Sequence, residues 1–584
     1  KGLIAMQPAA TIRISNVSSI EVILPKNSEI AECELFSEED VCLEELRWFP
    51  DTSVPHVSSK ISLAKHAHII KNAKIGVRDT AIRKKYLDLI LKYHDAVSED
   101  SLEFGQFKFA AHDIKLKNKD PFFRKQFPLP LDARPHLKAH LNKMLRAGVI
   151  EPCPDSSYNS PFFMLKKKDG ESWRFITDLR GVNARSCDDK YVGRDVQSCI
   201  DSVAESGAKV FSMLDISSGY YNLSLTPESK DKTAFSLPPG FSLIDDNGTP
   251  MPSRYQFRLL SMGLHGASSS FSKVMCYILR DIRHLLFYLD DILAFTKNHN
   301  EMLEILEMVL ERLCRYGIKY SLSKAFFGFS EINYLGHELS AQGIRPSTDN
   351  VAAIKDLPPP RTVKQVRSFV GLANFFRSYI SNYTSFASKL TALLRKDSDW
   401  KGGVLPPAAL TAFDGLKREI CKRPMLWYPD LNKCFELHTD ASRGNENEDG
   451  GIACVLVQRN NMGHPLPISF ASRGLKQHER NYSATGLECL AMHFGVFHFE
   501  KYLRGRKFLI YTDHKPLTHV TDRSTNRTIA RMVQELSEFQ HVIRYKPGKM
   551  NIADALSRAP LVTLEQLEFF EDEVSMTAAQ SVDP

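Results

Sequence analysis

Two adjacent aspartates, Asp290 and Asp291, interrupt an otherwise apolar run of the sequence. Apolar residues at 285–288 and 292–295 predict two buried strands joined as a hairpin, with the aspartates at its tip. Two carboxylates about 4 Å apart repel each other by roughly 4 kcal/mol at an effective dielectric of about 20. A fold therefore exposes such groups, neutralises one of them, or gives them a cation. A third carboxylate, Asp215, ends another apolar strand, and the three together suit two metal ions and phosphoryl transfer.

Positive charge is concentrated on another predicted hairpin, upstream of the aspartates. A strand that begins at Ser160 runs into Lys166, Lys167 and Lys168, and the chain returns through Arg174. Lysine supplies a mobile point charge and arginine a planar fork, and both suit a triphosphate. A lysine-rich turn is also a common solvated turn, and an Asp-Asp pair is common turn chemistry. Neither motif is decisive by itself.

The spacing of apolar residues indicates the elements that would position these motifs. Residues 132–148 predict a helix with Gly148 just after its last turn, and residues 301–316 predict a second helix that ends before Gly317. The Pro358-Pro-Pro run predicts a semi-rigid hinge.

A third helix is predicted from Thr362, with a capping box, to about Ile380. One face of this helix is polar and comprises Lys364, Arg367, Gly371, Asn374 and Ser378. A face centred on glycine allows a duplex backbone to approach closely while the cations meet phosphates. The same spacing fits a solvated surface helix equally well, so the alternative stays open on the spacing alone.

Composition restricts the class of protein. The chain has 584 residues, of which 43% are hydrophobic, enough for three to five folded units. The formal net charge is +7, a mild basic excess that suits a polyanionic partner without proving one. Eleven cysteines without a Cys-x-x-Cys pair indicate reduced thiols and argue against zinc or disulfides. No apolar run reaches the roughly 20 residues that span a bilayer, so we expect no membrane partner.

The motifs resemble a known family. Tyr288-Leu-Asp-Asp together with Asp215 looks like the palm of a reverse transcriptase, and the basic hairpin resembles its nucleotide-clamping fingers. Residues 100–560 are most similar to the reverse transcriptase–RNase H portion of a gypsy-class (Metaviridae) LTR retrotransposon polyprotein. The chain begins Lys-Gly without an initiator methionine, which indicates an internal piece of a longer protein. The resemblance implies an α+β multidomain fold, a right-hand polymerase with fingers, palm and thumb, followed by an RNase H-like α/β domain.

The expected domains follow from the same resemblance. They are an N-terminal β/helical connector (1–100), fingers and palm (101–342), thumb (343–403), a linker or connection-like segment (404–433), RNase H (434–560) and an acidic disordered tail (561–584).

The resemblance also implies roles for single residues of the polymerase. Asp215, Asp290 and Asp291 would be its catalytic metal ligands. Lys167 and Arg174 would contact the incoming triphosphate, and Asp178 and Arg180 would support their hairpin. Tyr220 would be a steric gate against the 2′-hydroxyl, and the backbone of Gly263 would lie near the nascent base pair. Nucleic acid would be bound by Leu335, Gly336 and His337 at the primer grip, and by Lys364, Arg367, Gly371 and Asn374 on the thumb helix.

A second set of acids resembles an RNase H site. Asp440 follows a predicted strand, Glu488 lies in a predicted helix over residues 482–502, Asp513 ends a further strand and Asp554 comes late. Any one of them is most often a plain surface residue. Four in this order, each on the appropriate element, are similar to the four catalytic metal ligands of RNase H domains.

The implied activity is that of an RNA- and DNA-dependent DNA polymerase, a nucleotidyltransferase, with RNase H endonuclease activity on RNA–DNA hybrids. The cofactor would be Mg²⁺, two ions per site, with Mn²⁺ as a substitute. The partners would be an RNA template, a DNA primer strand, dNTPs and a tRNA primer, within cytoplasmic virus-like particles. Alternatives are the passive structural subunit of an asymmetric dimer, a homodimer that uses one copy passively, and an RNA-dependent RNA polymerase. The last explains neither Tyr220 nor the RNase H motifs.

Overall fold

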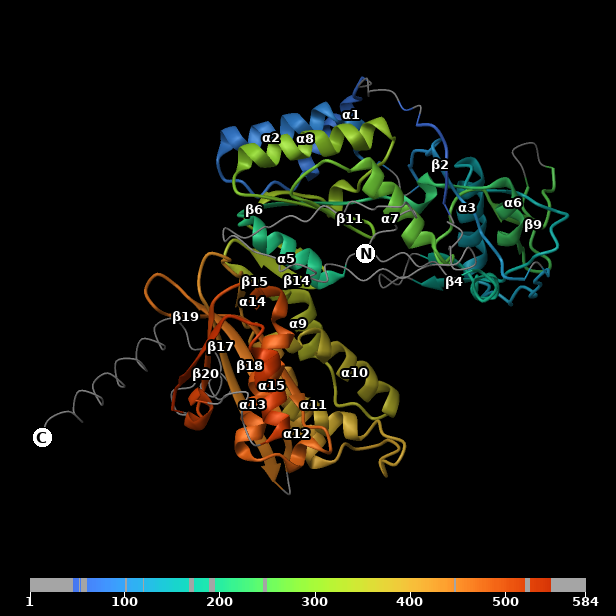
Figure 1. Cartoon of the computed structure of the whole chain (residues 1–584). Coiled ribbons are helices and arrows are strands. Elements are labelled where there is room, and N and C mark those ends of the chain that lie inside the picture. The colour runs from blue at the N-terminus through green and yellow to red at the C-terminus, as the bar shows by residue number, and fades with distance from the viewer. Residues whose placement is uncertain are drawn as a thin grey trace, which may run out of the picture.

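The computed structural model describes residues 46–51, 53, 60–99, 102–118, 120–166, 173–187, 195–244, 249–445, 448–519 and 526–547. The strands expected before residue 46, Lys167, Asp554 and the acidic tail lie outside these residues. Figure 1 shows two lobes, an upper one from the first half of the chain and a lower one from the second half. Within the described residues, no helix combines the length and the apolar character needed to cross a membrane.

The upper lobe is built around a four-stranded antiparallel sheet, the palm, in the order β10-β11-β6-β12. Its strands are β6 (Val210–Asp215), β10 (Leu285–Tyr288), β11 (Asp291–Thr296) and β12 (Phe326–Phe329). The hairpin predicted around the Asp pair is confirmed as β10 and β11. Helix α8 (His299–Arg315) confirms the second predicted helix and buries its apolar stripe, which includes Met302, Leu306 and Leu310.

The fingers extend from the palm as short strands and one long helix. The basic hairpin consists of β4 (Phe162–Lys166) and β5 (Trp173–Thr177), with Leu165 opposite Arg174. Helix α3 (Ala133–Arg146) confirms the helix predicted over 132–148, and Gly148 follows it with a φ of 68°. A left-handed backbone at this position favours glycine because glycine has no Cβ.

The segment before residue 100 is more than a connector. Helices α1 (Leu63–Asn72) and α2 (Thr80–Lys92) bury Ile69, Tyr86 and Ile90 in the same core as the palm. Figure 1 shows α2 lying along α8. A short strand, β1 (Leu46–Trp48), pairs with β2 (Ala110–His112). The described part of the predicted connector is therefore packed into the core of the palm.

The thumb contains β13 (Glu331–Tyr334), β14 (His337–Ser340), β15 (Gly343–Pro346), α9 (Thr348–Lys355), α10 (Val363–Phe375) and α11 (Tyr383–Ala392). The predicted capping box at Thr362 and Gln365 is present, although α10 ends at Phe375 and a 3₁₀ turn (Arg377–Tyr379) follows.

The segment predicted as a linker over 404–433 is folded into the thumb. Helix α12 (Pro407–Cys421) buries Phe413, Leu416 and Ile420 in the thumb core, and β16 (Leu426–Trp427) adds a fourth strand beside β15. A Cβ at Gly343 would lie 2.1 Å from the Leu426 carbonyl oxygen, so glycine is what allows β16 to pair there. The apolar face of α12 could not be matched to a partner from local spacing.

The lower lobe ends in a five-stranded sheet in the order β19-β18-β17-β20-β21. The predicted meander is confirmed as β17 (Phe435–Asn445), β18 (Glu448–Arg459) and β19 (Pro465–Gly474), followed by β20 (Phe508–Thr512) and β21 (His541–Tyr545). The helix expected over 482–502 is divided into α13 (Ala484–His498) and α14 (Glu500–Leu503), and α15 (Arg527–Leu536) packs against α13.

The two faces of this sheet have different neighbours. Helix α13 packs on one face, where Gly495 lies against Leu437. On the other face, Val455, Val457 and Phe470 join the apolar core of the thumb. A hydrogen bond between the Thr384 and Ser472 hydroxyls (3.0 Å) crosses the same seam. The C-terminal domain is therefore docked on the thumb through a shared core.

Candidate functional site

The three palm carboxylates meet at one edge of the central sheet. Strand pairing places Asp215, the last residue of β6, directly opposite Asp291, the first residue of β11. The Asp290 carbonyl oxygen accepts a hydrogen bond from the backbone amide of Ile216 (2.8 Å), which fixes the hairpin tip against β6. Leu289 turns the chain there with a φ of 55°. The structure thus brings together the three acids that the sequence identified as candidates.

The electrostatics of this group show crowded negative charge. Burial raises the pKa of Asp291 to about 6, and the charges of Asp215 and Asp290 act in the same direction. The pKa of Asp290 is also raised, by burial first and then by Asp215. Ionised carboxylates held this close are costly unless a cation offsets their repulsion.

A lysine that the sequence did not single out provides part of this offset. The Lys324 ammonium lies 3.2 Å from each carboxylate oxygen of Asp215. Lys324 belongs to a 3₁₀ turn (Leu322–Lys324) more than a hundred residues from Asp215. Because the contact depends on tertiary folding, no local pattern could have indicated it.

The carboxylates also fit a divalent cation by their chemistry. Oδ1 of Asp290 is buried and has no hydrogen-bond partner among the described residues. Carboxylate oxygens are the ligands that Mg²⁺ and Mn²⁺ prefer in proteins. No three His, Cys, Asp or Glu side chains within the described ranges are already arranged to hold a metal ion.

Tyr220, the predicted gate, lies near enough to this cluster for the charge of Asp290 to act on its hydroxyl. Its ring packs on Phe271 of α7 (Ala267–Ile278) with centroids 5.3 Å apart, and its hydroxyl lies 3.1 Å from the Ser268 hydroxyl. Burial raises the pKa of Tyr220, and the charge of Asp290 contributes. The ring thus packs on α7 within the electrostatic reach of Asp290.

Gly263 lies in the loop before the same helix. Its φ is 89°, and a Cβ at this position would meet no atom within 4 Å. The Gly263 carbonyl accepts a hydrogen bond from the Asn183 side-chain amide (2.8 Å), which anchors the loop to the fingers. The loop therefore leaves open space where the prediction places a base pair.

The fingers hairpin presents Arg174 on its exposed side. The support expected from Asp178 and Arg180 takes the form of a two-pronged ion pair, with nitrogen–oxygen distances of 2.7 and 2.8 Å. The hydrogen bonds from Arg180 lower the pKa of Asp178. Lys166 pairs with Asp132 (3.3 Å) and lies over the Trp173 ring, so it is already engaged.

The β13–β14 turn carries three of the residues predicted to contact nucleic acid. Leu335 and Gly336 form the turn with φ values of 47° and 82°. His337 is only 5% exposed, its Nδ1 lies 2.8 Å from the Tyr379 hydroxyl, and its ring stacks on Phe375 (4.9 Å). Burial lowers the pKa of His337 to about 4, so it is neutral. The His337 side chain therefore holds the turn against the thumb, and the predicted contact of this residue with nucleic acid stays a prediction.

The polar face predicted for the thumb helix is exposed along α10. Lys364, Arg367, Gly371 and Asn374 all face solvent. A Cβ at Gly371 would meet nothing within 4 Å, so packing within the chain does not require glycine there. Phe375, which the sequence did not single out, is 40% exposed next to this face.

The second carboxylate set lies in the C-terminal domain. Glu488 on α13 is 6% exposed and accepts hydrogen bonds from the Ala441 backbone amide (3.2 Å) and the Thr512 hydroxyl (3.4 Å). These contacts place it between β17, which carries Asp440, and the end of β20, where Asp513 follows. Burial raises the pKa of Glu488 to about 8, and the charges of Asp513 and Asp440 add to the effect. Three of the four predicted acids therefore converge, and Asp554 lies outside the described residues.

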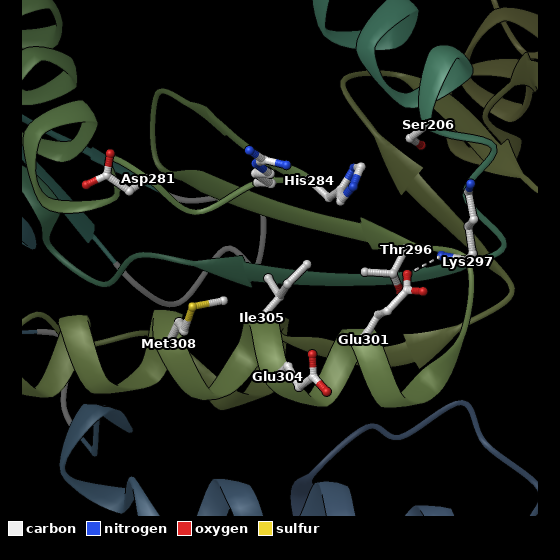
Figure 2. Close-up of a pocket in the computed structure, with 10 residues that line it drawn as sticks. Ser206, Asp281, His284, Thr296, Lys297, Glu301, Glu304, Ile305 and Met308 are labelled. Carbon is white, nitrogen blue, oxygen red and sulfur yellow. Dashed lines mark hydrogen bonds between the residues drawn. The ribbon is translucent and has the colours of Figure 1, made fainter.

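A pocket of about 430 Å³ lies away from both clusters. Figure 2 shows that His284, just before β10, and Thr296, at the end of β11, line it together with residues of α8. This is the end of the β10–β11 hairpin opposite to the Asp290 tip. None of the predicted site residues lines this pocket. The candidate catalytic sites are therefore the two carboxylate clusters and not this pocket.

Two family models match the chain, and each match contains one of the two carboxylate clusters. The model described as reverse transcriptase (RNA-dependent DNA polymerase) matches residues 165–339. The model described as an RNase H-like domain found in reverse transcriptase matches residues 430–539.

Curated relatives show the same combination. The retrovirus-related Pol polyprotein from transposon opus of Drosophila melanogaster is 30% identical over 519 residues, which cover 86% of this chain and 50% of that protein. Its counterpart from transposon gypsy is 30% identical over 506 residues, 83% of this chain and 46% of that protein. The chain thus spans half or less of the length of these relatives.

Solved structures share the fold. The foamy viral protease-reverse transcriptase in complex with dsDNA matches with a TM-score of 0.67 and 20% identity, over 84% of this chain and 98% of that chain. The same kind of protein in complex with an RNA/DNA hybrid matches with a TM-score of 0.64 and 19% identity, over 87% of this chain and 66% of that chain. The chain therefore carries a reverse transcriptase domain followed by an RNase H-like domain, and it is similar over most of its length to the Pol polyproteins of gypsy-type LTR retrotransposons.

Proposed function

We propose that this chain is an RNA- and DNA-dependent DNA polymerase with RNase H activity that replicates an LTR retrotransposon. The observation that carries the proposal is the presence of two separate carboxylate clusters, one at the palm edge and one beside α13, each on the domain matched by the corresponding family model. One chain would thus copy RNA into DNA and remove the RNA strand from the hybrid.

At the palm, Asp215, Asp290 and Asp291 would hold two divalent cations, Mg²⁺ or Mn²⁺. When bound, these ions lower the pKa of the primer 3′-hydroxyl and neutralise charge on the phosphates. Arg174 would orient the outer phosphates of the dNTP, because its exposed guanidinium forms no hydrogen bond or ion pair with other described residues. Lys324 screens Asp215 and keeps its carboxylate oriented.

On the duplex, the Leu335–Gly336 turn and the α10 face would hold the primer strand. The exposed Lys364 and Arg367 meet phosphates, while Gly371 leaves room for the backbone between them. The foamy viral structures with dsDNA and with an RNA/DNA hybrid share this fold and support such partners. A tRNA primer and dNTPs complete the proposed set of substrates.

In the RNase H domain, Asp440, Glu488 and Asp513 would hold the cations that activate water for RNA cleavage, with Asp554 as the proposed fourth ligand. Glu488 keeps its proton near neutral pH in the metal-free protein, because its pKa is about 8. Metal binding would therefore release this proton, which couples metal affinity to pH. The 2′-hydroxyl would identify the strand to be cut.

Replacing Tyr220 with alanine should allow ribonucleotides to be incorporated. The ring packs on Phe271 within reach of the Asp290 charge, where it would block a 2′-hydroxyl, and alanine leaves that space open. We expect the dNTP/NTP discrimination to fall by about 10-fold or more, with the incorporation of dNTPs less affected. Single-nucleotide extension with matched dNTP and NTP measures the ratio, and unchanged sugar discrimination would refute the gate.

The proposed function itself is tested by one assay on a primer extended along labelled RNA. Labels on both strands report DNA synthesis and RNA cleavage in the same tube, with and without Mg²⁺. Both activities are expected in Mg²⁺ and neither after chelation. Absence of synthesis on both RNA and DNA templates would contradict the assignment.

A further inference from the structure

Two helices from opposite halves of the chain meet at one carboxylate. Asp201 lies on α5 (Val196–Ser206), beneath the palm, and accepts hydrogen bonds from the Lys501 ammonium (2.5 Å) and the Tyr502 hydroxyl (3.0 Å). Both donors belong to α14 of the RNase H domain, about 300 residues further along the chain. The contact thus joins the polymerase to the nuclease directly, apart from their connection through the thumb.

The geometry of this contact is well defined. The side-chain amide of Gln197 donates a further hydrogen bond (3.0 Å) to the same Asp201 oxygen that Tyr502 reaches, which fixes the orientation of the carboxylate. The side chain of Asp201 is 23% exposed and that of Lys501 is 46% exposed. The contact therefore has a defined geometry. Because both side chains are partly exposed, removing one partner leaves the other charge in contact with water.

Each partner leads directly to a catalytic strand. Helix α5 ends at Ser206 with Gly207 as its C-cap, and the chain then enters β6, which carries Asp215 at its far end. On the other side, the ring of Tyr502 stacks on Phe435 (6.1 Å, 28°), the first residue of β17, which carries Asp440. The Asp201 contact therefore connects the bases of the two strands that hold the first acid of each cluster.

We propose that Asp201, Lys501 and Tyr502 form a positioning latch that sets how far behind the primer terminus the RNase H site cuts the RNA. The proposal rests on the proposed function. Because both sites act on one duplex, the distance between them fixes the number of base pairs between the nucleotide last added and the cut. The shared core with the thumb limits the travel of the RNase H domain, and the latch fixes its remaining rotation against the palm.

The latch can be tested in the full chain by charge reversal and by a charge swap. The polymerase is stalled on a labelled RNA–DNA hybrid by omitting one dNTP, and the RNA cuts are mapped relative to the primer 3′ end. We expect Asp201→Lys to increase the share of cuts outside the main position by roughly two- to five-fold, as suits a partly exposed ion pair. The double variant Asp201→Lys with Lys501→Asp should restore the original pattern.

Two further variants separate positioning from folding. Tyr502→Phe removes only the hydroxyl and keeps the ring against Phe435, and it should broaden the cut positions less than charge reversal does. Glu500→Gln is the matched control on the same short helix, because Glu500 pairs with Arg504 inside the RNase H domain and should leave the pattern unchanged. DNA synthesis and total RNA cleavage should stay near the level of the unmodified chain in all variants.

Unchanged cut positions in Asp201→Lys and Tyr502→Phe, with both activities retained, would overturn the latch. Failure of the charge swap to restore the pattern would also overturn it, since the pairing would then not be the cause. If the unmodified chain neither extends a primer nor cuts RNA, the proposed function fails instead, and that outcome is distinct from a change in the cut pattern.

Discussion

Asp215→Asn is expected to reduce DNA synthesis by more than about a hundredfold while leaving RNA cleavage in a preformed hybrid intact. Loss of even a residue that only supports a metal ligand commonly costs 10–100-fold in metal affinity or activity, and Asp215 is a proposed ligand itself. The same change removes one cause of the raised pKa of Asp291, which should fall from about 6 toward its ordinary value. Primer extension and hybrid cleavage on separate substrates measure the two activities.

The control for this variant is Asp281→Asn, the same chemical change in the same lobe. Asp281 is exposed at the pocket on the opposite end of the hairpin, and its φ of 70° suits asparagine. We expect full synthesis from this control. If Asp215→Asn synthesised DNA at near the normal rate, Asp215 would not be a catalytic ligand. If it lost DNA synthesis and RNA cleavage equally, the two carboxylate clusters would not act independently.

Glu488→Gln is expected to abolish RNA cleavage and, at the same time, to stabilise the metal-free protein at alkaline pH. An acid whose pKa rises from 4.5 to about 8 on folding favours the folded state while it is protonated. Its contribution to stability is therefore lost as the pH rises from about 4.5 through about 8. Glutamine cannot ionise, so the gain in the free energy of unfolding should be on the order of a few kcal/mol at pH 8 and small at pH 5.

Thermal unfolding with a chelator present, at pH 5 and pH 8, measures this effect. Glu538→Gln serves as the control, because Glu538 is exposed and forms a solvent-accessible ion pair with Arg504 at 3.8 Å. A lower melting temperature for Glu488→Gln than for the unmodified chain at pH 8 would show that ionisation of Glu488 does not destabilise the folded protein. Retained RNA cleavage would remove Glu488 from the proposed ligand set.

Predictions from the sequence succeeded where a short pattern and its structure coincide. The apolar residues flanking Asp290 form the predicted strands, and Thr362 forms the predicted capping box, because neighbouring residues decide both features. The order of acids around Glu488 identified a real cluster, since strand ends and a helix face bring side chains together in a regular way.

The sequence could not predict the features that distant segments of the chain decide. The sequence shows a histidine after Gly336 but not that Tyr379 and Phe375 enclose it, so its burial could not be foreseen. No sequence pattern around Lys324 indicates its contact with Asp215, because only folding brings the two residues together. The segment 404–433 has an amphipathic helix whose partner is the thumb, and spacing alone does not name a partner.

The face of the RNase H sheet opposite α13 packs on the thumb, which affects whether the two domains can be separated. Val455, Val457 and Phe470 are 1%, 0% and 8% exposed because thumb side chains cover them. Cleavage of the chain near residue 434 would expose apolar surface on both fragments if they separated. Each fragment would then tend to aggregate or to bind another apolar surface. The RNase H-like domain and the thumb therefore depend on each other for burial of their apolar faces, and a change of side-chain volume at Val455, Val457 or Phe470 has to be accommodated by the thumb.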